Sequence, residues 1–97
     1  MLQEDRKNLS KKTKDMKRAI DSLREELEAI DYYSQRADAA SNTELKEIMI
    51  HNRNEEIEHA AMIIEWLRRN DKDFDKEIND YLFTKEKITE VEEEMTN

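Results

Sequence analysis

The feature that most constrains the fold of this 97-residue chain is the absence of both glycine and proline. Glycine supplies the left-handed backbone of tight turns, and proline fixes the backbone where helices stop. A chain without them has few low-energy turns, so long uninterrupted helices are favoured over a fold of strands and turns. The sequence also lacks cysteine, which excludes disulfides, thiolate metal sites and cysteine nucleophiles.

Apolar spacing and capping residues predict two long helices joined by a very short break. The first helix is expected over residues 11–40, after an N-cap at Ser10, and its apolar seam follows heptad-like spacing. The second is expected over residues 43–70, with Asn42 as its N-cap. Because so few residues separate them, the two helices are expected to fold back as an antiparallel hairpin.

The rest of the chain is expected to add one short helix. It is predicted roughly over residues 74–83, after a polar turn in which Asp73 is a candidate cap. Residues 1–9 show no stable period and are predicted to form a flexible arm, while the acidic residues 86–97 are predicted to be weakly helical or disordered. The expected fold class is all-α: an antiparallel two-helix hairpin plus a short C-terminal helix, in one domain over residues 10–85.

Composition indicates a chain that has difficulty in building its own core. Charged residues make up 43% of the sequence and apolar residues only 36%, so association between copies is an expected remedy. The net charge of −8 disfavours nucleic acid as a partner and favours attraction of cations. The longest apolar run, residues 60–64, is too short to span a bilayer, and no signal peptide opens the chain. A soluble cytoplasmic protein, with no membrane partner, is expected.

A polar patch interrupts the apolar face of the second predicted helix. On a helical wheel, Asn52, Glu56 and His59 fall among the apolar positions of that face. An ionised glutamate in such a place is costly unless it is paired or coordinates a metal. One interpretation is a hydrogen-bonded Glu56–His59 pair without metal, with an arginine as a further partner; the other is a metal site.

The first predicted helix offers a carboxylate at the matching height. Glu26 lies about 15 residues before the break and Glu56 about 15 residues after it, so an antiparallel hairpin brings them to one level. One carboxylate plus a Glu-x-x-His motif is half of the di-iron carboxylate site of ferritin-like four-helix bundles. A two-fold symmetric dimer would supply the other two helices and the other ligands, which predicts a four-helix bundle shared by two chains. Such a ligand set suits iron or manganese, and zinc is chemically able to replace them.

A second apolar line on the same helix indicates a further contact. Ile50, Ile57 and Ile64 follow a strict heptad on the side of the helix away from Glu56. This line either packs against the third helix of the same chain or forms a second subunit interface.

Several groups of residues, spread over all three predicted helices, share the pattern of one protein family. They are Glu25-Glu26-Leu27-Glu28-Ala29 with Asp31, Tyr33 and Gln35-Arg36; His51-Asn52-Arg53 with Glu55-Glu56; Glu58-His59-Ala60-Ala61-Met62; Glu65-Trp66 with Arg68-Arg69; and Phe74-Asp75-Lys76-Glu77 with Asp80-Tyr81-Leu82-Phe83. Together, over roughly residues 10–85, they resemble encapsulated ferritin.

The resemblance implies a two-helix ferritin-like protomer whose ferroxidase centre forms only where two protomers meet. It implies that Glu26, Glu56 and His59 are iron ligands, repeated from the partner chain, and that Tyr33 lies beside the centre with a catalytic role. It also implies that dimers assemble into a ring, typically a decamer.

Other matched positions concern metal uptake and delivery. The resemblance implies that Glu25 and Glu28 form a metal attraction site outside the centre. Tyr32 departs from the family pattern, which often has tryptophan there, and this leaves open the details of that site. Family members commonly end in a short targeting peptide with glycine and leucine that docks inside an encapsulin shell. The last residues here are acidic and contain no glycine, so either that peptide lies outside this sequence or loading differs.

We therefore expect a ferroxidase that oxidises Fe(II) to Fe(III) at a di-iron centre, with two iron ions per dimer. It is expected to feed iron storage inside an encapsulin nanocompartment in the cytoplasm, with the encapsulin shell protein as partner. Zinc, manganese or calcium are expected as substitutes for iron. Two alternatives stay open: a helical dimer that binds zinc or manganese without redox turnover, and a metal-free structural helical oligomer.

Overall fold

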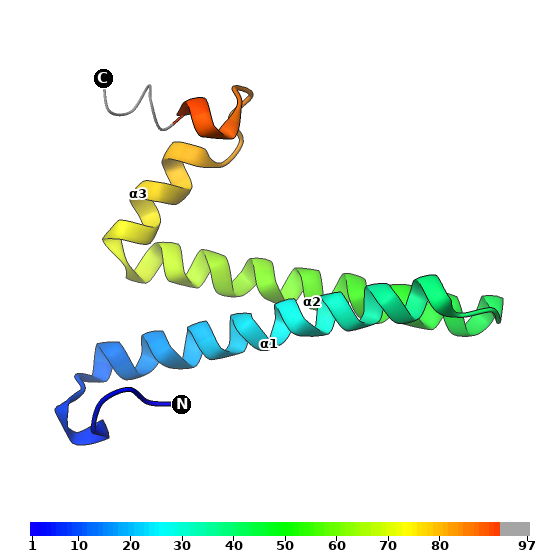
Figure 1. Cartoon of the computed structure of the whole chain (residues 1–97). Coiled ribbons are helices and arrows are strands. Elements are labelled where there is room, and N and C mark those ends of the chain that lie inside the picture. Colours follow the sequence, from blue (N-terminus) through cyan, green and yellow to red (C-terminus); the bar gives the residue numbers. More distant parts are fainter. Residues whose placement is uncertain (92–97) are drawn as a thin grey trace. The chain divides into compact units, whose positions relative to one another are not determined.

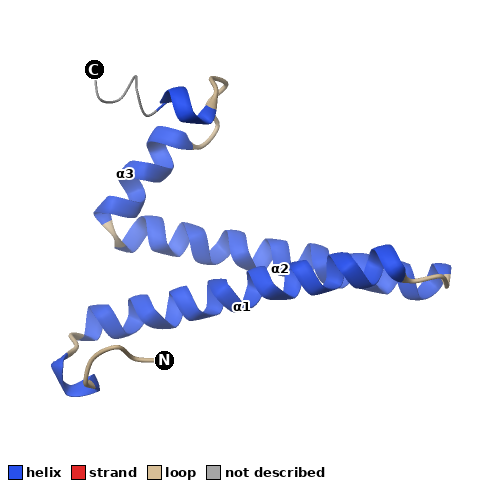
Figure 2. Cartoon of the chain, viewed as in Figure 1, coloured by secondary structure: helices blue, strands red, loops and turns tan. Residues whose placement is uncertain are grey.

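Figure 1 shows the computed structural model of the chain, which describes residues 1–91. The described residues form helices joined by short loops, without any strand (Figure 2). A 3-10 turn, η1 (Arg6–Asn8), precedes three α-helices, α1 (Lys11–Ala39), α2 (Thr43–Asn70) and α3 (Lys72–Tyr81). The all-α fold class with two long helices and a short third one is confirmed. Among these helices, none is long and apolar enough to cross a membrane.

Polar caps begin both long helices at the residues predicted from the sequence. Ser10 Oγ accepts a hydrogen bond from the N–H of Thr13 at 3.1 Å, and Asn42 Oδ1 accepts one from the N–H of Leu45 at 2.9 Å. Each cap satisfies a backbone donor that has no partner within its own helix. The bounds of α1 and α2 agree with the prediction to within one residue.

The two long helices form an antiparallel hairpin, in which α1 and the first part of α2 lie side by side (Figure 1). This hairpin belongs to a compact unit that comprises Met1–Ile64, and the residues from Glu65 onward form a second unit. Arg53 Nε of α2 donates to Ser34 Oγ of α1 at 2.8 Å, and Ser34 Oγ in turn donates to the carbonyl of Ile30 at 2.6 Å. This link fixes the relative height of the two helices one turn away from Glu56.

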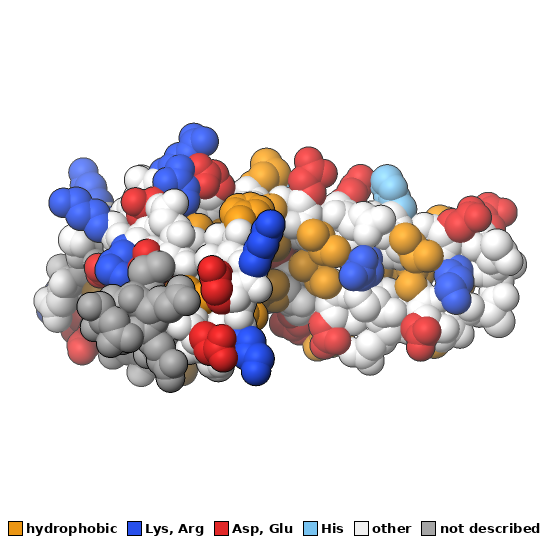
Figure 3. All heavy atoms as spheres, turned by 90° about the horizontal axis from the view of Figure 1, so that it is seen from above, with side chains coloured by type: hydrophobic (Ala, Val, Ile, Leu, Met, Phe, Trp, Pro, Cys, Tyr) orange, Lys and Arg blue, Asp and Glu red, His pale blue; other side chains and the backbone are white. Residues whose placement is uncertain are grey.

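The described part of the chain buries few apolar side chains, in keeping with its low apolar content. The buried apolar residues are Ala37 and Ala60 in the first unit and Leu67 and Val91 in the second. Many larger apolar side chains of the long helices stay at least one-third exposed, and hydrophobic and charged side chains are interspersed on the face drawn in Figure 3. A single copy therefore leaves much of its apolar seam facing solvent, which is the condition that favours association between copies.

The isoleucine line of α2 is also exposed in the single chain. Ile50, Ile57 and Ile64 each keep more than a third of their surface accessible. Both predicted roles of this line, packing against the third helix of the same chain and forming a second subunit interface, therefore stay predictions.

The third helix begins earlier than predicted, and the predicted cap is wrong. α3 starts at Lys72 rather than at residue 74, because Asp71 and not Asp73 is its N-cap. The backbone of Asp71 is extended, with φ −145° and ψ 120°, and its carboxylate accepts hydrogen bonds from the N–H groups of Asp73 and Phe74. Two aspartates lie close together in this turn, and sequence alone did not distinguish which one leaves the helix.

The third helix also ends earlier than the predicted residue 83. Its last residue is Tyr81, and Phe83 has a φ of 63°, in the left-handed region that glycine usually occupies. Because the chain has no glycine, a fully exposed phenylalanine takes this conformation. Helical backbone resumes at residues 88–91. The rest of the predicted acidic tail, residues 92–97, lies outside the described residues.

Ion pairs connect the end of α2 to α3 within the second unit. The Arg68 guanidinium lies 2.7 Å from both Glu65 and Asp75, and Arg69 lies 2.6 Å from Glu65. Hydrogen bonds from Arg68, and next from Arg69, lower the pKa of Glu65 to about 2. These exposed pairs orient the junction of the two helices more than they stabilise it, because solvent screens them.

The assignment of the α3 cap leads to a direct test. Asp71→Ala should lower the free energy of unfolding by about 1 kcal/mol, because two N–H groups lose their acceptor. Asp73→Ala removes the same charge from the same turn but keeps the cap, so its effect should be smaller. Amide hydrogen exchange at Phe74, together with thermal unfolding, measures both. A larger loss for Asp73→Ala, or unchanged exchange at Phe74 in Asp71→Ala, would contradict the assignment.

Candidate metal centre

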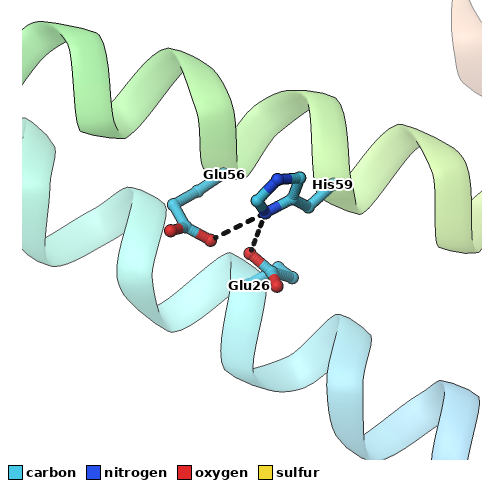
Figure 4. Close-up of side chains that lie close together, drawn as sticks. All are labelled: Glu26, Glu56 and His59. Carbon is cyan, nitrogen blue, oxygen red and sulfur yellow. Dashed lines mark ion pairs between the residues drawn. The ribbon is translucent and has the colours of Figure 1, made fainter.

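Three potential metal ligands converge between the two helices of the hairpin. Glu26 comes from α1, while Glu56 and His59 lie three residues apart on α2 and so project from the same face of that helix (Figure 4). His59 Nδ1 lies 3.6 Å from Glu26 Oε2 and 3.5 Å from Glu56 Oε2. One donor atom from each of the three lies within 4.8 Å of the others. We call Glu26, Glu56 and His59 the triad.

The triad residues approach one another without forming hydrogen bonds. The distances from the imidazole nitrogen to the two carboxylates exceed the usual 2.7–3.2 Å range for N–H···O bonds. Glu26 Oε2 is shielded from solvent and has no hydrogen-bond partner among the described residues. The hydrogen-bonded Glu56–His59 pair that a metal-free interpretation requires is therefore not formed in the single chain.

Among residues 1–91, no arginine forms an ion pair or a hydrogen bond with the triad either. Arg53, which is one turn before Glu56, donates to Ser34 Oγ at 2.8 Å and to Asn54 Oδ1 at 3.2 Å instead. This link could not be predicted from the sequence, because an arginine among so many surface charges gives no signal of its partner. Two carboxylates and one imidazole thus share a small volume, and the two carboxylates repel each other there.

The donor chemistry of the triad fits a transition-metal ion. Carboxylate oxygens and an imidazole nitrogen together suit iron, manganese or zinc. A buried carboxylate oxygen without a partner destabilises the fold unless a cation binds it. The shielded, unbonded oxygen of Glu26 therefore fits the role of a metal ligand. A cation between the three side chains would satisfy that oxygen and relieve the repulsion between the carboxylates.

The triad is open on one side. The two glutamate side chains are about three-quarters buried, whereas 48% of the His59 side chain is exposed. Three protein ligands on an open face leave further coordination positions for water, substrate or ligands from another chain.

The remaining predicted site residues lie outside the triad. Tyr33 is partly buried two turns beyond Glu26 on α1, and Arg36 lies over its ring, 5.2 Å from the centroid. The same guanidinium lies 5.8 Å from the centroid of Tyr32. No hydrogen bond between described residues connects Tyr33 to the triad. The catalytic role of Tyr33 therefore stays a prediction.

The two outer carboxylates are exposed on α1. Neither Glu25 nor Glu28 belongs to the group of converging donors. A hydrogen bond to Glu28 is the main cause that raises the pKa of the Tyr32 hydroxyl. Glu28 therefore interacts with Tyr32, the residue at which this chain departs from the pattern expected from the resemblance.

A family model connects this geometry to known proteins. The model described as EncFtn-like matches residues 1–85, which is most of the chain and includes the whole triad. The chain belongs to the EncFtn-like family. The resemblance to encapsulated ferritin predicted from the sequence is thus confirmed.

Two relatives of this EncFtn-like chain carry names of the same kind. It is 52% identical over 84 residues to an "Encapsulated ferritin-like protein" of Rhodospirillum rubrum, covering 87% of this chain and 60% of that protein. It is 49% identical over 86 residues to a "Ferritin-like protein" of Thermotoga maritima, covering 89% of this chain and 75% of the relative. The EncFtn-like chain therefore spans less than two-thirds of the Rhodospirillum rubrum protein.

The fold has a close counterpart among solved structures. The crystal structure of protein ne0167 from Nitrosomonas europaea matches with a TM-score of 0.86 and 59% sequence identity. The match covers 90% of this EncFtn-like chain and 96% of that one, so most of the helical fold is shared.

Proposed function

We propose that this chain is the protomer of a ferroxidase, which oxidises Fe(II) to Fe(III) at a centre formed by the triads of two copies. The observation that carries the proposal is the Glu26 oxygen, which is shielded from solvent and unbonded although an imidazole and a second carboxylate face it. Membership of the EncFtn-like family adds the expectation of an iron-related, ferritin-like function.

A second copy supplies what one chain lacks. A single triad offers three ligands, whereas two metal ions in a ferritin-like bundle are held by a glutamate from each of two helices and a Glu-x-x-His from each of the other two. Leu27, Ile48 and Leu45 are each about half exposed, and the sequence places all three on the apolar seams of the hairpin. Packing these seams against a two-fold related copy would bury them and bring two triads together.

The ligand set favours oxidation of its substrate ions. Carboxylates are hard, anionic donors that stabilise Fe(III) more strongly than Fe(II), so they lower the free energy of losing an electron. Two Fe(II) ions each give up one electron, and dioxygen takes both electrons with two protons to form hydrogen peroxide. Peroxide, as the alternative oxidant, takes two electrons and two protons to form two water molecules. The protein holds the two ions close together and excludes bulk water from one side of each ion.

The outer residues of α1 have supporting roles in this proposal. Glu25 and Glu28 are exposed and acidic, so they would raise the local concentration of cations near the centre. Tyr33, positioned by Arg36, would lie beside the centre and is proposed to take part in the electron transfer. The hydrogen bond from Tyr32 to Glu28 is proposed to orient that carboxylate in the attraction site.

The proposal extends to a larger assembly. The name of the Rhodospirillum rubrum relative describes that protein as encapsulated. We propose by analogy that dimers of this chain form a ring, with a decamer as the expected size, inside an encapsulin nanocompartment of the cytoplasm that stores the ferric product. A hairpin of two helices encloses no large cavity of its own, so a separate shell is the simplest store.

An anaerobic Fe(II) titration followed by native mass spectrometry tests the proposal. The expected result is two iron ions per pair of chains, with rapid consumption of dioxygen once air is admitted. Zinc and manganese serve as comparison ions, because the same donors also accept them. Binding of metal without oxygen consumption would indicate the non-redox alternative, and no change in mass or melting temperature with any of these ions would indicate the metal-free oligomer.

A further inference from the structure

A small basic pocket lies at the start of the first unit, away from the triad. The N-terminal residues turn through η1 and come back over the first turns of α1, where Leu2, Arg6, Lys14, Lys17, Arg18 and Asp21 line a hollow of about 190 Å³. Four of these six side chains are cationic and one is anionic. The pocket is therefore locally positive in a chain whose net charge is −8.

The one carboxylate of the pocket is already engaged. Asp21 lies 2.8 Å from Lys17 Nζ and 3.1 Å from Arg24. The hydrogen bond to Asp21 raises the pKa of Lys17, which keeps that ammonium protonated, and the same bond lowers the pKa of Asp21. Asp21 thus holds Lys17 in place and leaves little negative charge for the other cations.

Two cations of the pocket have no acidic partner. Arg18 pairs with the exposed Asp15 at 2.7 Å, but the side chains of Arg6 and Lys14 make no ion pair with any described residue. Arg6 contributes a planar, forked set of donors, and Lys14 contributes a point charge from the next element. Like charges that converge on one hollow repel one another unless an anion lies between them.

We propose that this pocket binds a small inorganic oxyanion of the phosphate class. The donors that converge on the hollow are guanidinium and ammonium groups, which recognise phosphate oxygens through charge-assisted hydrogen bonds. A polyanion is disfavoured because it would extend beyond the pocket and be repelled by the net negative charge of the chain. A small anion inside the pocket is affected less, because salt screens it from the more distant acidic residues. A nucleotide is disfavoured because no aromatic side chain lines the pocket to stack on a base. The proposal does not depend on the ferroxidase proposal, since none of its residues belongs to the triad.

Equilibrium dialysis of radiolabelled inorganic phosphate against the full chain tests the proposal, at constant ionic strength and without added metal. We expect saturable binding to the parent protein. The double variant Arg6→Gln with Lys14→Gln should bind phosphate at least ten-fold more weakly, because both unpaired cations are lost. The matched control is Lys11→Gln with Lys12→Gln, which removes the same charge from the same segment but leaves the lining intact. Circular dichroism verifies that both variants keep the helical content of the parent.

The comparison of the variants decides the outcome. If the control variant still binds phosphate and the pocket variant does not, the result would support a specific phosphate site in the pocket. Equal weakening in both variants, or binding that never saturates, would overturn it and indicate a general charge effect. Adenosine monophosphate serves as a competitor. If the protein binds it no more tightly than inorganic phosphate, the pocket recognises the phosphate group alone. Markedly tighter binding of the nucleotide would overturn the assignment to a free oxyanion.

Discussion

Replacing Glu56 with alanine should lower the rate of Fe(II) oxidation by at least about 100-fold. Loss of a residue that merely orients a metal ligand already costs roughly 10- to 100-fold in affinity or activity, so loss of a ligand should reach or exceed the upper end. In a two-fold dimer each substitution removes two ligands, one from each triad. Stopped-flow absorbance after mixing aerobic protein with Fe(II) measures the rate, and the iron content per chain measures binding.

Glu55→Ala is the matched control for this variant. Glu55 is the preceding residue on α2 and carries the same charge, but its carboxylate is exposed and lies 2.9 Å from His51, away from the triad. Its loss should leave the oxidation rate within about two-fold of the parent. The ferroxidase proposal would be wrong if Glu56→Ala oxidised Fe(II) as fast as the parent. Equal damage from both variants would point to general electrostatics instead of a ligand.

Leu27→Asp should abolish iron oxidation although it leaves every member of the triad unchanged. Leu27 follows Glu26 directly and is 53% exposed in the single chain, so the hairpin itself should tolerate the change. In the proposed dimer the leucine is buried twice, once from each copy. Losing about 1.5–3 kcal/mol of burial at each position raises the dissociation constant roughly 10²- to 10⁴-fold, before the cost of burying a charge. Analytical ultracentrifugation and the oxygen-consumption assay measure the two effects together.

A control for Leu27→Asp is Ile88→Asp, which introduces the same charge at a position outside the hairpin. Ile88 is 74% exposed, and its replacement should change neither the molar mass nor the oxidation rate. Circular dichroism of both variants checks that the helices persist. If the Leu27→Asp protein stayed dimeric and oxidised Fe(II) at the parental rate, the proposal that two chains share the metal centre through this seam would be wrong.

The hairpin was predictable because local signals and long-range geometry agree there. Ser10 and Asn42 are strong N-caps, and the break between the helices is short, which favours an antiparallel return. Equal distance from that break then places Glu26 opposite Glu56 and His59, and the structure brings the three side chains together. Their role as metal ligands stays a prediction.

Other features depended on interactions that the sequence does not reveal. Asp71 and Asp73 are both good caps, and the choice between them is set by which backbone leaves the helix. The left-handed conformation of Phe83 contradicts residue preference, since a glycine would be expected there. The Arg53–Ser34 link and the basic pocket at η1 arise from side chains that come together only once the chain has folded. Surface charges of this kind look alike in a sequence with 43% charged residues.

The convergence of two carboxylates without a hydrogen bond has a thermodynamic consequence for the whole hairpin. The fold holds Glu26 and Glu56 together against their mutual repulsion, and in the unfolded chain the two charges separate. A cation that binds only the folded form adds stability that grows with the logarithm of its free concentration. The melting temperature of the hairpin should therefore follow the free concentration of the ion, which makes folding itself a reporter of metal supply.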